Sequence, residues 1–184
     1  LGCFFRFVLP KSLARQLPVK SKLPPNRDNP RILKRRVILL EGCVQSSLSP
    51  NTNLAAARIL EKLDVGTITM ASENCCGAMH YHSNSQVKGL AHAKRLTDQL
   101  IVALEEGAEA IISTASGCGN FIKDYPGLFL EDKEYKEKAT RIADATRDIS
   151  EFLDAEDLGA LQPATGQTLA FHSPCTLQHG QKLA

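Results

Sequence analysis

Residues 37–43 read Val-Ile-Leu-Leu-Glu-Gly-Cys, a short apolar run that ends in a glycine and a cysteine. Consecutive β-branched and leucine side chains are typical of a strand that is buried on both faces of a parallel sheet. Similar runs occur at residues 67–70, 110–114 and 168–172, and each precedes a segment that contains cysteine. The sequence therefore predicts four strands whose carboxyl ends lead into thiols.

Helical segments separate these predicted strands. A first helix is expected near Asn51 or Asn53, either of which could be its N-cap, with Leu60 on its apolar face. Longer helices are predicted at about residues 85–106, before Gly107, and at about 134–153. Strands that alternate with helices predict right-handed βαβ crossovers. The fold class is therefore α/β, with a mostly parallel sheet and helices on both of its faces.

Five of the six cysteines would lie at one edge of this sheet. They are Cys43, Cys75, Cys76, Cys118 and Cys175. Open α/β sheets bind ligands at the carboxyl ends of their strands, and thiolates select zinc, copper(I) or iron–sulfur clusters. Neighbours such as Cys75 and Cys76 are poorly placed for a disulfide with each other. The pattern predicts a metal or cluster site, while Cys3, beside two phenylalanines, is expected to be buried outside it.

The residues alone leave several explanations for the thiols. A disulfide framework is disfavoured because nothing indicates secretion and a domain of this size needs no staples. A structural zinc site could combine cysteine with His80, His82 or His172, but such sites usually contain Cys-x-x-Cys pairs, which this sequence lacks. Thiol–disulfide exchange by Cys75 or Cys76 is disfavoured because the sequence contains no Cys-x-x-Cys pair. An iron–sulfur cluster is favoured, because it accepts thiolates from several loops at irregular spacing.

The 184 residues carry their charge unevenly. Residues 1–36 contain ten Lys and Arg against one acidic residue, so twelve basic and nineteen acidic residues remain in the rest. Five of the nine prolines lie in the same arm and prevent a continuous helix. No run approaches the roughly 20 apolar residues of a membrane span. We expect a cytoplasmic protein with at most peripheral membrane contact, and no nucleic-acid binding because the body is acidic.

Three stretches resemble a known family. They are residues 37–45 (Val-Ile-Leu-Leu-Glu-Gly-Cys-Val-Gln), residues 75–77 (Cys-Cys-Gly) and residues 116–125 (Ser-Gly-Cys-Gly-Asn-Phe-Ile-Lys-Asp-Tyr). Together they resemble one repeat of the cysteine-rich CCG domain found in heterodisulfide reductases and their relatives, and specifically the iron–sulfur subunits of glycolate oxidases. Residues 172–175 (His-Ser-Pro-Cys) are similar to the opening of a second repeat.

This resemblance implies a domain organisation. Residues 1–35 would be a basic, proline-rich linker after a ferredoxin-like domain that this chain lacks. Residues 36–165 would be the first CCG repeat, and residues 166–184 the start of a second, truncated one. The chain contains no Cys-x-x-Cys-x-x-Cys run for ferredoxin-type clusters, and Ala115 stands where the fullest CCG pattern has another cysteine.

The resemblance also implies a function in electron transfer. Flavin-bearing partner subunits, with FAD, would oxidise glycolate to glyoxylate, and this subunit would relay the electrons. Four thiolates, the number that a [4Fe-4S] cluster needs, would come from Cys43, Cys75, Cys76 and Cys118. Cys175 is a further candidate, and no catalytic residue is expected in this chain. Related lactate or glycerol-3-phosphate dehydrogenase subunits, and a zinc-binding scaffold without redox function, are the alternatives.

Overall fold

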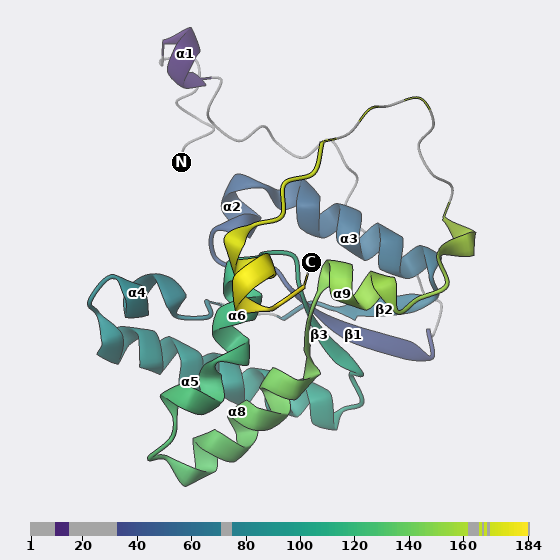
Figure 1. Cartoon of the computed structure of the whole chain (residues 1–184). Helices are drawn as coiled ribbons and strands as arrows, with labels where there is room; N and C mark the ends of the chain where they lie inside the picture. Colours follow the sequence, from purple (N-terminus) through teal and green to yellow (C-terminus); the bar gives the residue numbers. More distant parts are fainter. Residues whose placement is uncertain are drawn as a thin grey trace.

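A single parallel sheet forms the centre of the protein. The structure, a computed structural model, describes residues 10–14, 33–70, 75–161, 166, 168 and 170–183. In this part of the chain four strands pair in the order β2-β1-β3-β4 (Figure 1). They are β1 (Arg35–Leu40), β2 (Val65–Ile68), β3 (Ala110–Ser113) and β4 (Thr146–Asp148). All three pairings are parallel, so the predicted α/β fold with a parallel sheet is confirmed.

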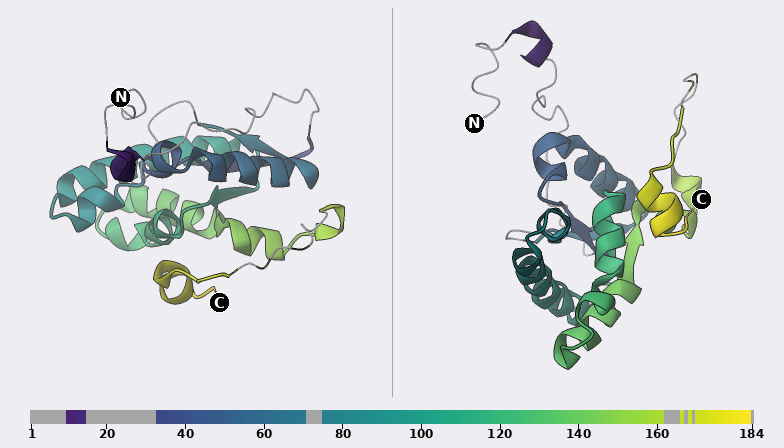
Figure 2. Two further views of the ribbon diagram at one scale, coloured as in Figure 1. Left: turned by 90° about the horizontal axis from the view of Figure 1, so that it is seen from above. Right: turned by 60° about the vertical axis from the view of Figure 1, so that its left-hand side comes forward.

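Helices connect the strands and cover both faces of the sheet (Figures 1 and 2). After β1 come α2 (Gln45–Leu48) and α3 (Pro50–Lys62), and after β2 come α4 (Ala78–His82) and α5 (Gln86–Glu105). After β3 come α6 (Ser116–Lys123), α7 (Tyr125–Leu128) and α8 (Lys133–Ala145), and α9 (Ile149–Asp154) follows β4. The described ends of the chain add α1 (Lys11–Ala14), η1 (Leu158–Ala160) and η2 (Thr176–Gly180).

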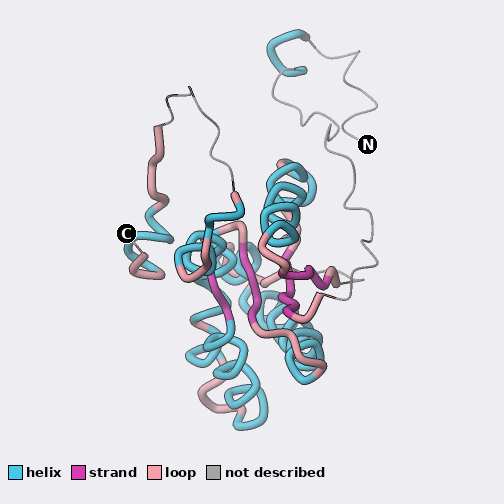
Figure 3. The backbone as a smooth tube through the Cα atoms, turned by 90° about the vertical axis from the view of Figure 1, so that its right-hand side faces the viewer, coloured by secondary structure: helices cyan, strands magenta, loops and turns pink. Residues whose placement is uncertain are grey.

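Two hydrophobic cores lie on opposite faces of the sheet. Successive side chains of a strand point to opposite faces, and in β1 Ile38 and Leu40 pack with α5, α6 and α8. Val37 and Leu39 pack instead with α3 and α9. The helical layers on the two sides of the strands can be followed in Figure 3. Burial of all four side chains explains why this run contains no polar residue.

The helix predicted at about residues 134–153 is interrupted. α8 ends at Ala145, the next three residues form β4, and α9 begins at Ile149. Asp148 is the N-cap of α9 and forms a capping box with Glu151, whose side chain accepts a hydrogen bond from the Asp148 backbone while the Asp148 side chain accepts one from the Glu151 backbone. The Asp148 side chain also accepts a hydrogen bond from the backbone of Ser150. A capping box starts a new helix rather than continuing an old one. The uninterrupted helix was therefore a wrong prediction.

The strand predicted at residues 168–172 is also wrong. The structure describes residues 168 and 170–172 of this range, and none of them belongs to a strand. A strand is stable only beside a partner, and β4 occupies the free edge of β3 instead. Phe171 is 83% exposed. Cys175 therefore follows no strand.

Other predictions agree with the structure or fall outside its described part. α5 matches the helix predicted at residues 85–106, whereas α3 begins at Pro50, ahead of both predicted N-caps. Of the linker predicted at residues 1–35, only residues 10–14 and 33–35 are described, and Cys3 lies outside the described residues. Among the helices that the structure describes, none has the length and apolar character that a bilayer span requires.

Candidate metal centre

The order of the strands brings three cysteine-bearing segments to one edge of the sheet. From the central strand β1, the chain crosses to β2 on one side and later to β3 on the other. Such a reversal opens a crevice at the carboxyl ends of the strands, where α/β proteins bind ligands. Cys43 lies in the turn after β1, Cys75 and Cys76 lie in the loop between β2 and α4, and Cys118 lies in the first turn of α6 after β3.

The four thiols interact in two pairs. Cys43 lies beside Cys75 and Cys76 lies beside Cys118, and each pair is close enough for one thiol to shift the pKa of the other. The pairs are also close enough to influence each other electrostatically, because the charges of Cys43 and Cys75 both act on Cys118. The structure thus places the four predicted ligands near one another. They range from the exposed Cys43 to the buried Cys76.

Pairing and burial shift the pKa values of these thiols. The hydrogen bond to Cys118, followed by burial, raises the pKa of Cys76 strongly, because both favour the protonated form. The same hydrogen bond lowers the pKa of Cys118, which accepts it. Burial, and then the hydrogen bond to Cys75, raises the pKa of Cys43.

The thiols do not surround a single point. In the described residues no three Cys, His, Asp or Glu side chains are arranged as ligands of one metal ion. A mononuclear zinc site would need its donors at about 2.0–2.3 Å from one ion. A [4Fe-4S] cluster makes a different demand, because each thiolate binds a separate iron. Four thiols in two neighbouring pairs fit that donor set in number and chemistry.

Asn53 joins the two central strands beside these thiols. Its side-chain Nδ2 donates to the carbonyl oxygen of Glu41 at 2.8 Å, and its Oδ1 accepts from the Thr114 hydroxyl at 2.6 Å. Asn53 is only 8% exposed. The sequence suggested an N-cap at this position, but the side chain instead ties the chain after β1 to the chain after β3. In the sequence, the feature that could have indicated this role is a polar asparagine on the apolar face of an amphipathic helix, because a buried polar side chain needs hydrogen-bond partners.

A cavity of about 350 Å³ opens between α3 and the carboxyl ends of β1 and β2. Glu41 and Ser46 contribute to its lining and flank Cys43 in sequence. Thr67 and Thr69 contribute hydroxyl groups from the opposite side. Cys43 does not line this cavity, although its thiol is exposed.

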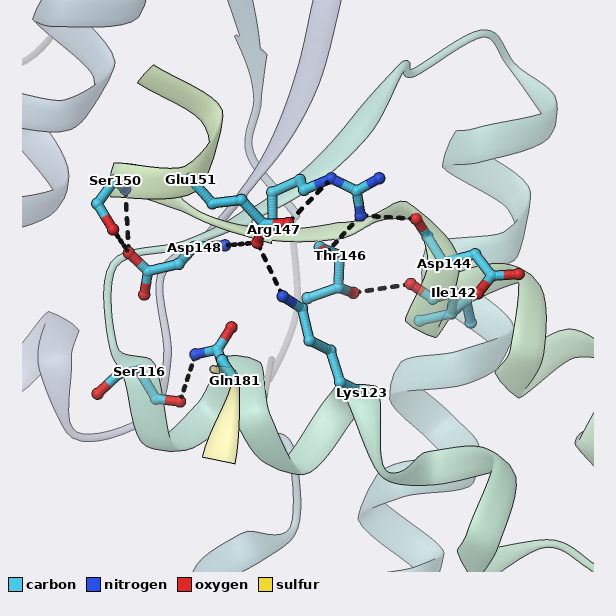
Figure 4. Close-up of polar contacts among 10 residues, drawn as sticks. All are labelled: Ser116, Lys123, Ile142, Asp144, Thr146, Arg147, Asp148, Ser150, Glu151 and Gln181. Atoms are coloured by element: carbon cyan, nitrogen blue, oxygen red, sulfur yellow. Dashed lines mark hydrogen bonds and ion pairs between the residues drawn. The ribbon is translucent and has the colours of Figure 1, made fainter. Parts of the chain in front are cut away.

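Cys175 is not a member of either thiol pair among the described residues. Its thiol is exposed, and the helix η2 that follows it packs on α6. The Ser116 and Thr176 hydroxyl groups lie 2.7 Å apart, and Gln181 Nε2 donates to the carbonyl oxygen of Ser116 at 3.0 Å. The second of these contacts is visible in Figure 4. The structure thus brings the C-terminal segment beside the helix of Cys118 without joining Cys175 to the other thiols.

Charged side chains near α6 are paired with each other. Lys123 donates to Glu151 at 2.8 Å, and Arg147 also contacts this carboxylate, at 3.4 Å (Figure 4). The positive charge at the end of α6 is therefore neutralised by α9.

The histidines that sequence reasoning considered as ligands pack mainly against rings. His80 stacks on His92 with ring centroids 5.1 Å apart, and His82 meets the ring of Phe121 edge-on. His172 is exposed.

Residues 37–123 match a protein family described as "Cysteine-rich domain" (CCG), and this range includes both thiol pairs. These residues form a CCG domain. Cys3 and Cys175 lie outside the matched range.

Several curated proteins are similar to the chain that contains this CCG domain. The "Glycolate oxidase iron-sulfur subunit" of Escherichia coli (strain K12) is 46% identical over 187 residues, which cover 100% of this chain and 45% of the relative. The "Probable glycolate oxidase iron-sulfur subunit" of Bacillus subtilis (strain 168) is 30% identical, covering 94% of this chain and 40% of the relative. "Lactate utilization protein A" of Bacillus velezensis is 30% identical, and the match covers 68% of this chain and 52% of the relative.

The chain spans about half or less of the length of these relatives. No solved structure matches the chain.

Proposed function

We propose that this chain belongs to the electron-transfer iron–sulfur subunit of a glycolate oxidase. The observation that carries the proposal is the meeting of four thiols from three separate segments in the crevice beside β1 and β3. They are Cys43, Cys75, Cys76 and Cys118, and we propose that they bind a [4Fe-4S] cluster. Similarity to proteins named as iron–sulfur subunits supports this choice of metal group.

The bound cluster would accept and release single electrons. The chain itself would hold the cluster between the two thiol pairs and shield one side of it, since Cys76 is only 4% exposed. Cys118 lies at the N-terminal end of α6, where the helix dipole favours a negatively charged thiolate. The exposed Cys43 lies on the solvent side, where an electron-transfer partner could approach.

The partner would carry the oxidation chemistry. Flavin cofactors remove hydride from hydroxy acids, whereas the site in this chain consists of thiols. We propose that a flavoprotein subunit with FAD oxidises glycolate to glyoxylate and passes the electrons to the cluster. Lactate is a second candidate substrate, supported by the similarity to proteins named for lactate utilization.

We further propose the domain boundaries expected from the sequence. Residues 1–35 would link this region to a ferredoxin-like domain, residues 36–165 would form the first CCG repeat, and residues 166–184 would begin a second repeat. The family match at residues 37–123 lies inside the proposed first repeat. In the described C-terminal part, packing of η2 on α6 supports a second repeat that continues beside the first.

Metal and sulfide analysis of the anaerobically purified full-length protein tests this proposal. We expect a brown protein with broad visible absorbance that dithionite bleaches, and with acid-labile sulfide. Cys75→Ser and Cys76→Ser should each lower the iron content, whereas the control Cys3→Ser should retain it. Equal iron content in all three variants, or a colourless protein with stoichiometric zinc, would refute the assignment.

A further inference from the structure

Tyr125 connects the cysteine loop to the helices after β3. It is the largest of the fully buried side chains in the described residues, and its hydroxyl donates to the backbone carbonyl of Cys76 at 2.6 Å. Phe121 and Phe129 pack edge-on against its ring, with centroids 5.6 and 6.1 Å away. A buried hydroxyl needs a hydrogen-bond partner, and here that partner belongs to a proposed cluster ligand.

A contact between two glycines fixes the other side of the same loop. Gly77 has a φ of 89°, a conformation that favours glycine. A Cβ atom on Gly77 would overlap the carbonyl oxygen of Gly89 in α5, and one on Gly89 would lie 2.8 Å from the Tyr81 Cβ atom in α4. Backbone therefore packs directly on backbone where the loop enters α4. Any side chain at either position would push the loop away from α5.

The two anchors explain how adjacent cysteines reach different partners. Cys75 pairs with Cys43 on the side of β1, while Cys76 pairs with Cys118 on the side of β3. Neighbouring side chains point apart in this way only if the backbone between and after them is held in one conformation. Tyr125 holds the carbonyl of Cys76, and Gly89 holds the residue that follows.

We infer that Tyr125 and Gly89 are positioning residues of the metal centre, which hold the Cys75–Gly77 loop so that each thiol faces its own side of the crevice. The inference rests on the proposed function for its biological purpose. The geometry of the loop can be tested independently of iron.

Alkylation of the cluster-free full-length protein tests the positioning directly. In Tyr125→Phe the Cys76 carbonyl loses its buried donor, and we expect iodoacetamide to modify Cys76 roughly tenfold faster, the factor for loss of one buried hydrogen bond. Tyr135→Phe is the matched control, because it removes a tyrosine hydroxyl that bonds Asp98 on the exposed surface. Equal Cys76 rates in the two variants, each with a wild-type circular dichroism spectrum, would overturn the inference.

A second pair of variants examines the glycine contact. Gly89→Ala should also raise the Cys76 alkylation rate, whereas the control Gly127→Ala should not, since a Cβ atom at Gly127 meets no atom within 4 Å. If Tyr125→Phe fails to fold, this pair alone decides. Unchanged rates in a folded Gly89→Ala variant would contradict the inference.

The iron-loaded protein gives the third readout. We expect Tyr125→Phe to release iron to a chelator about tenfold faster than wild type and to show an altered EPR signal, with Tyr135→Phe unchanged. If the purified wild-type protein contained no iron, the proposed function would be refuted. The alkylation rates would then still decide whether Tyr125 and Gly89 position the loop. Iron-loaded wild type and Tyr125→Phe with identical release rates and EPR signals would refute the inference alone.

Discussion

Removal of the Asn53 side chain should destabilise the fold at the carboxyl edge of the sheet. Asn53→Ala deletes two hydrogen bonds at a position that is only 8% exposed, and it leaves the Glu41 carbonyl and the Thr114 hydroxyl without this partner. Each lost hydrogen bond costs about 1 kcal/mol, and a buried group left unpaired costs about 1–3 kcal/mol. Alanine recovers roughly 0.5 kcal/mol through its higher helix propensity.

The balance is a loss of about 2–3 kcal/mol in the free energy of unfolding, because the unpaired groups outweigh the gain in helix propensity. Urea unfolding followed by circular dichroism measures it, and the midpoint should fall by roughly 1 M with an unchanged slope. Asn51→Ala is the control, since Asn51 lies in the same helix with an exposed side chain. It shares the propensity gain and loses no buried bond.

Two results would contradict this reasoning. If the free energies of unfolding of Asn53→Ala and Asn51→Ala differed by less than about 0.5 kcal/mol, the hydrogen bonds of Asn53 would contribute no more to stability than ordinary surface contacts do. If Asn53→Asp were as stable as wild type, the bond to the Glu41 carbonyl would be dispensable, because aspartate keeps the acceptor for Thr114 and loses the amide donor. A large loss confined to Asn53 would identify it as the link between β1 and β3.

Two further changes test the periphery of the domain. Arg35 donates a side-chain hydrogen bond to Glu156 at 2.7 Å, and this bond lowers the pKa of Glu156. The pair therefore stabilises the fold at pH values above the unfolded-state pKa of about 4.3. This stabilisation is lost as the pH falls through the lower folded-state pKa. Glu156→Gln should therefore cost up to about 1 kcal/mol at pH 7, and this difference should vanish in acid; an equal cost at both pH values would contradict the pairing. Asp148→Ala removes the capping box of α9 and should lower the thermal midpoint by the equivalent of about 1 kcal/mol, whereas loss of the exposed Asp144 carboxylate should not.

The central part of the fold could be predicted because its signals are local and strong. The four consecutive apolar residues at 37–40 and the similar run at 110–113 are removed from water only if both faces of the strand are buried. Such burial occurs in β1 and β3. The strand at 168–172 had the same apolar character, but no free sheet edge remained beside β3. Pairing depends on the whole topology, so a single run could not reveal that β4 takes this place.

The break between α8 and α9 was readable in part. Asp148 and Glu151 have the spacing of a capping box, and Asp148 occupies the N-cap position in the structure. Helical periodicity before and after them concealed the signal, because apolar residues continue at nearly the same spacing through the break. The three residues of β4 are too few to show a pattern of their own.

For the metal centre, the sequence indicated the edge but not the pairing. Parallel strands bring their carboxyl ends together, so the loops of Cys43, Cys75, Cys76 and Cys118 had to lie near one another once the order of the strands was known. Which thiol faces which depends on side-chain direction within the loop. Tyr125 could not be assigned from sequence for the same reason, since its partner is a backbone carbonyl 49 residues earlier.

The Cys-Cys-Gly sequence now has a physical explanation. A Cys-x-x-Cys turn in one segment aims both sulfurs at the same point, as zinc knuckles require. Two adjacent cysteines in extended backbone point to opposite sides, and here one loop supplies a thiol to each side of the crevice, with Cys75 directed to Cys43 and Cys76 to Cys118. Gly77 must follow directly, because the chain turns there at positive φ and passes against Gly89 without room for a side chain. In the described residues these thiols do not form a set of three or more ligands for one metal ion, so the two pairs are not arranged as a mononuclear site.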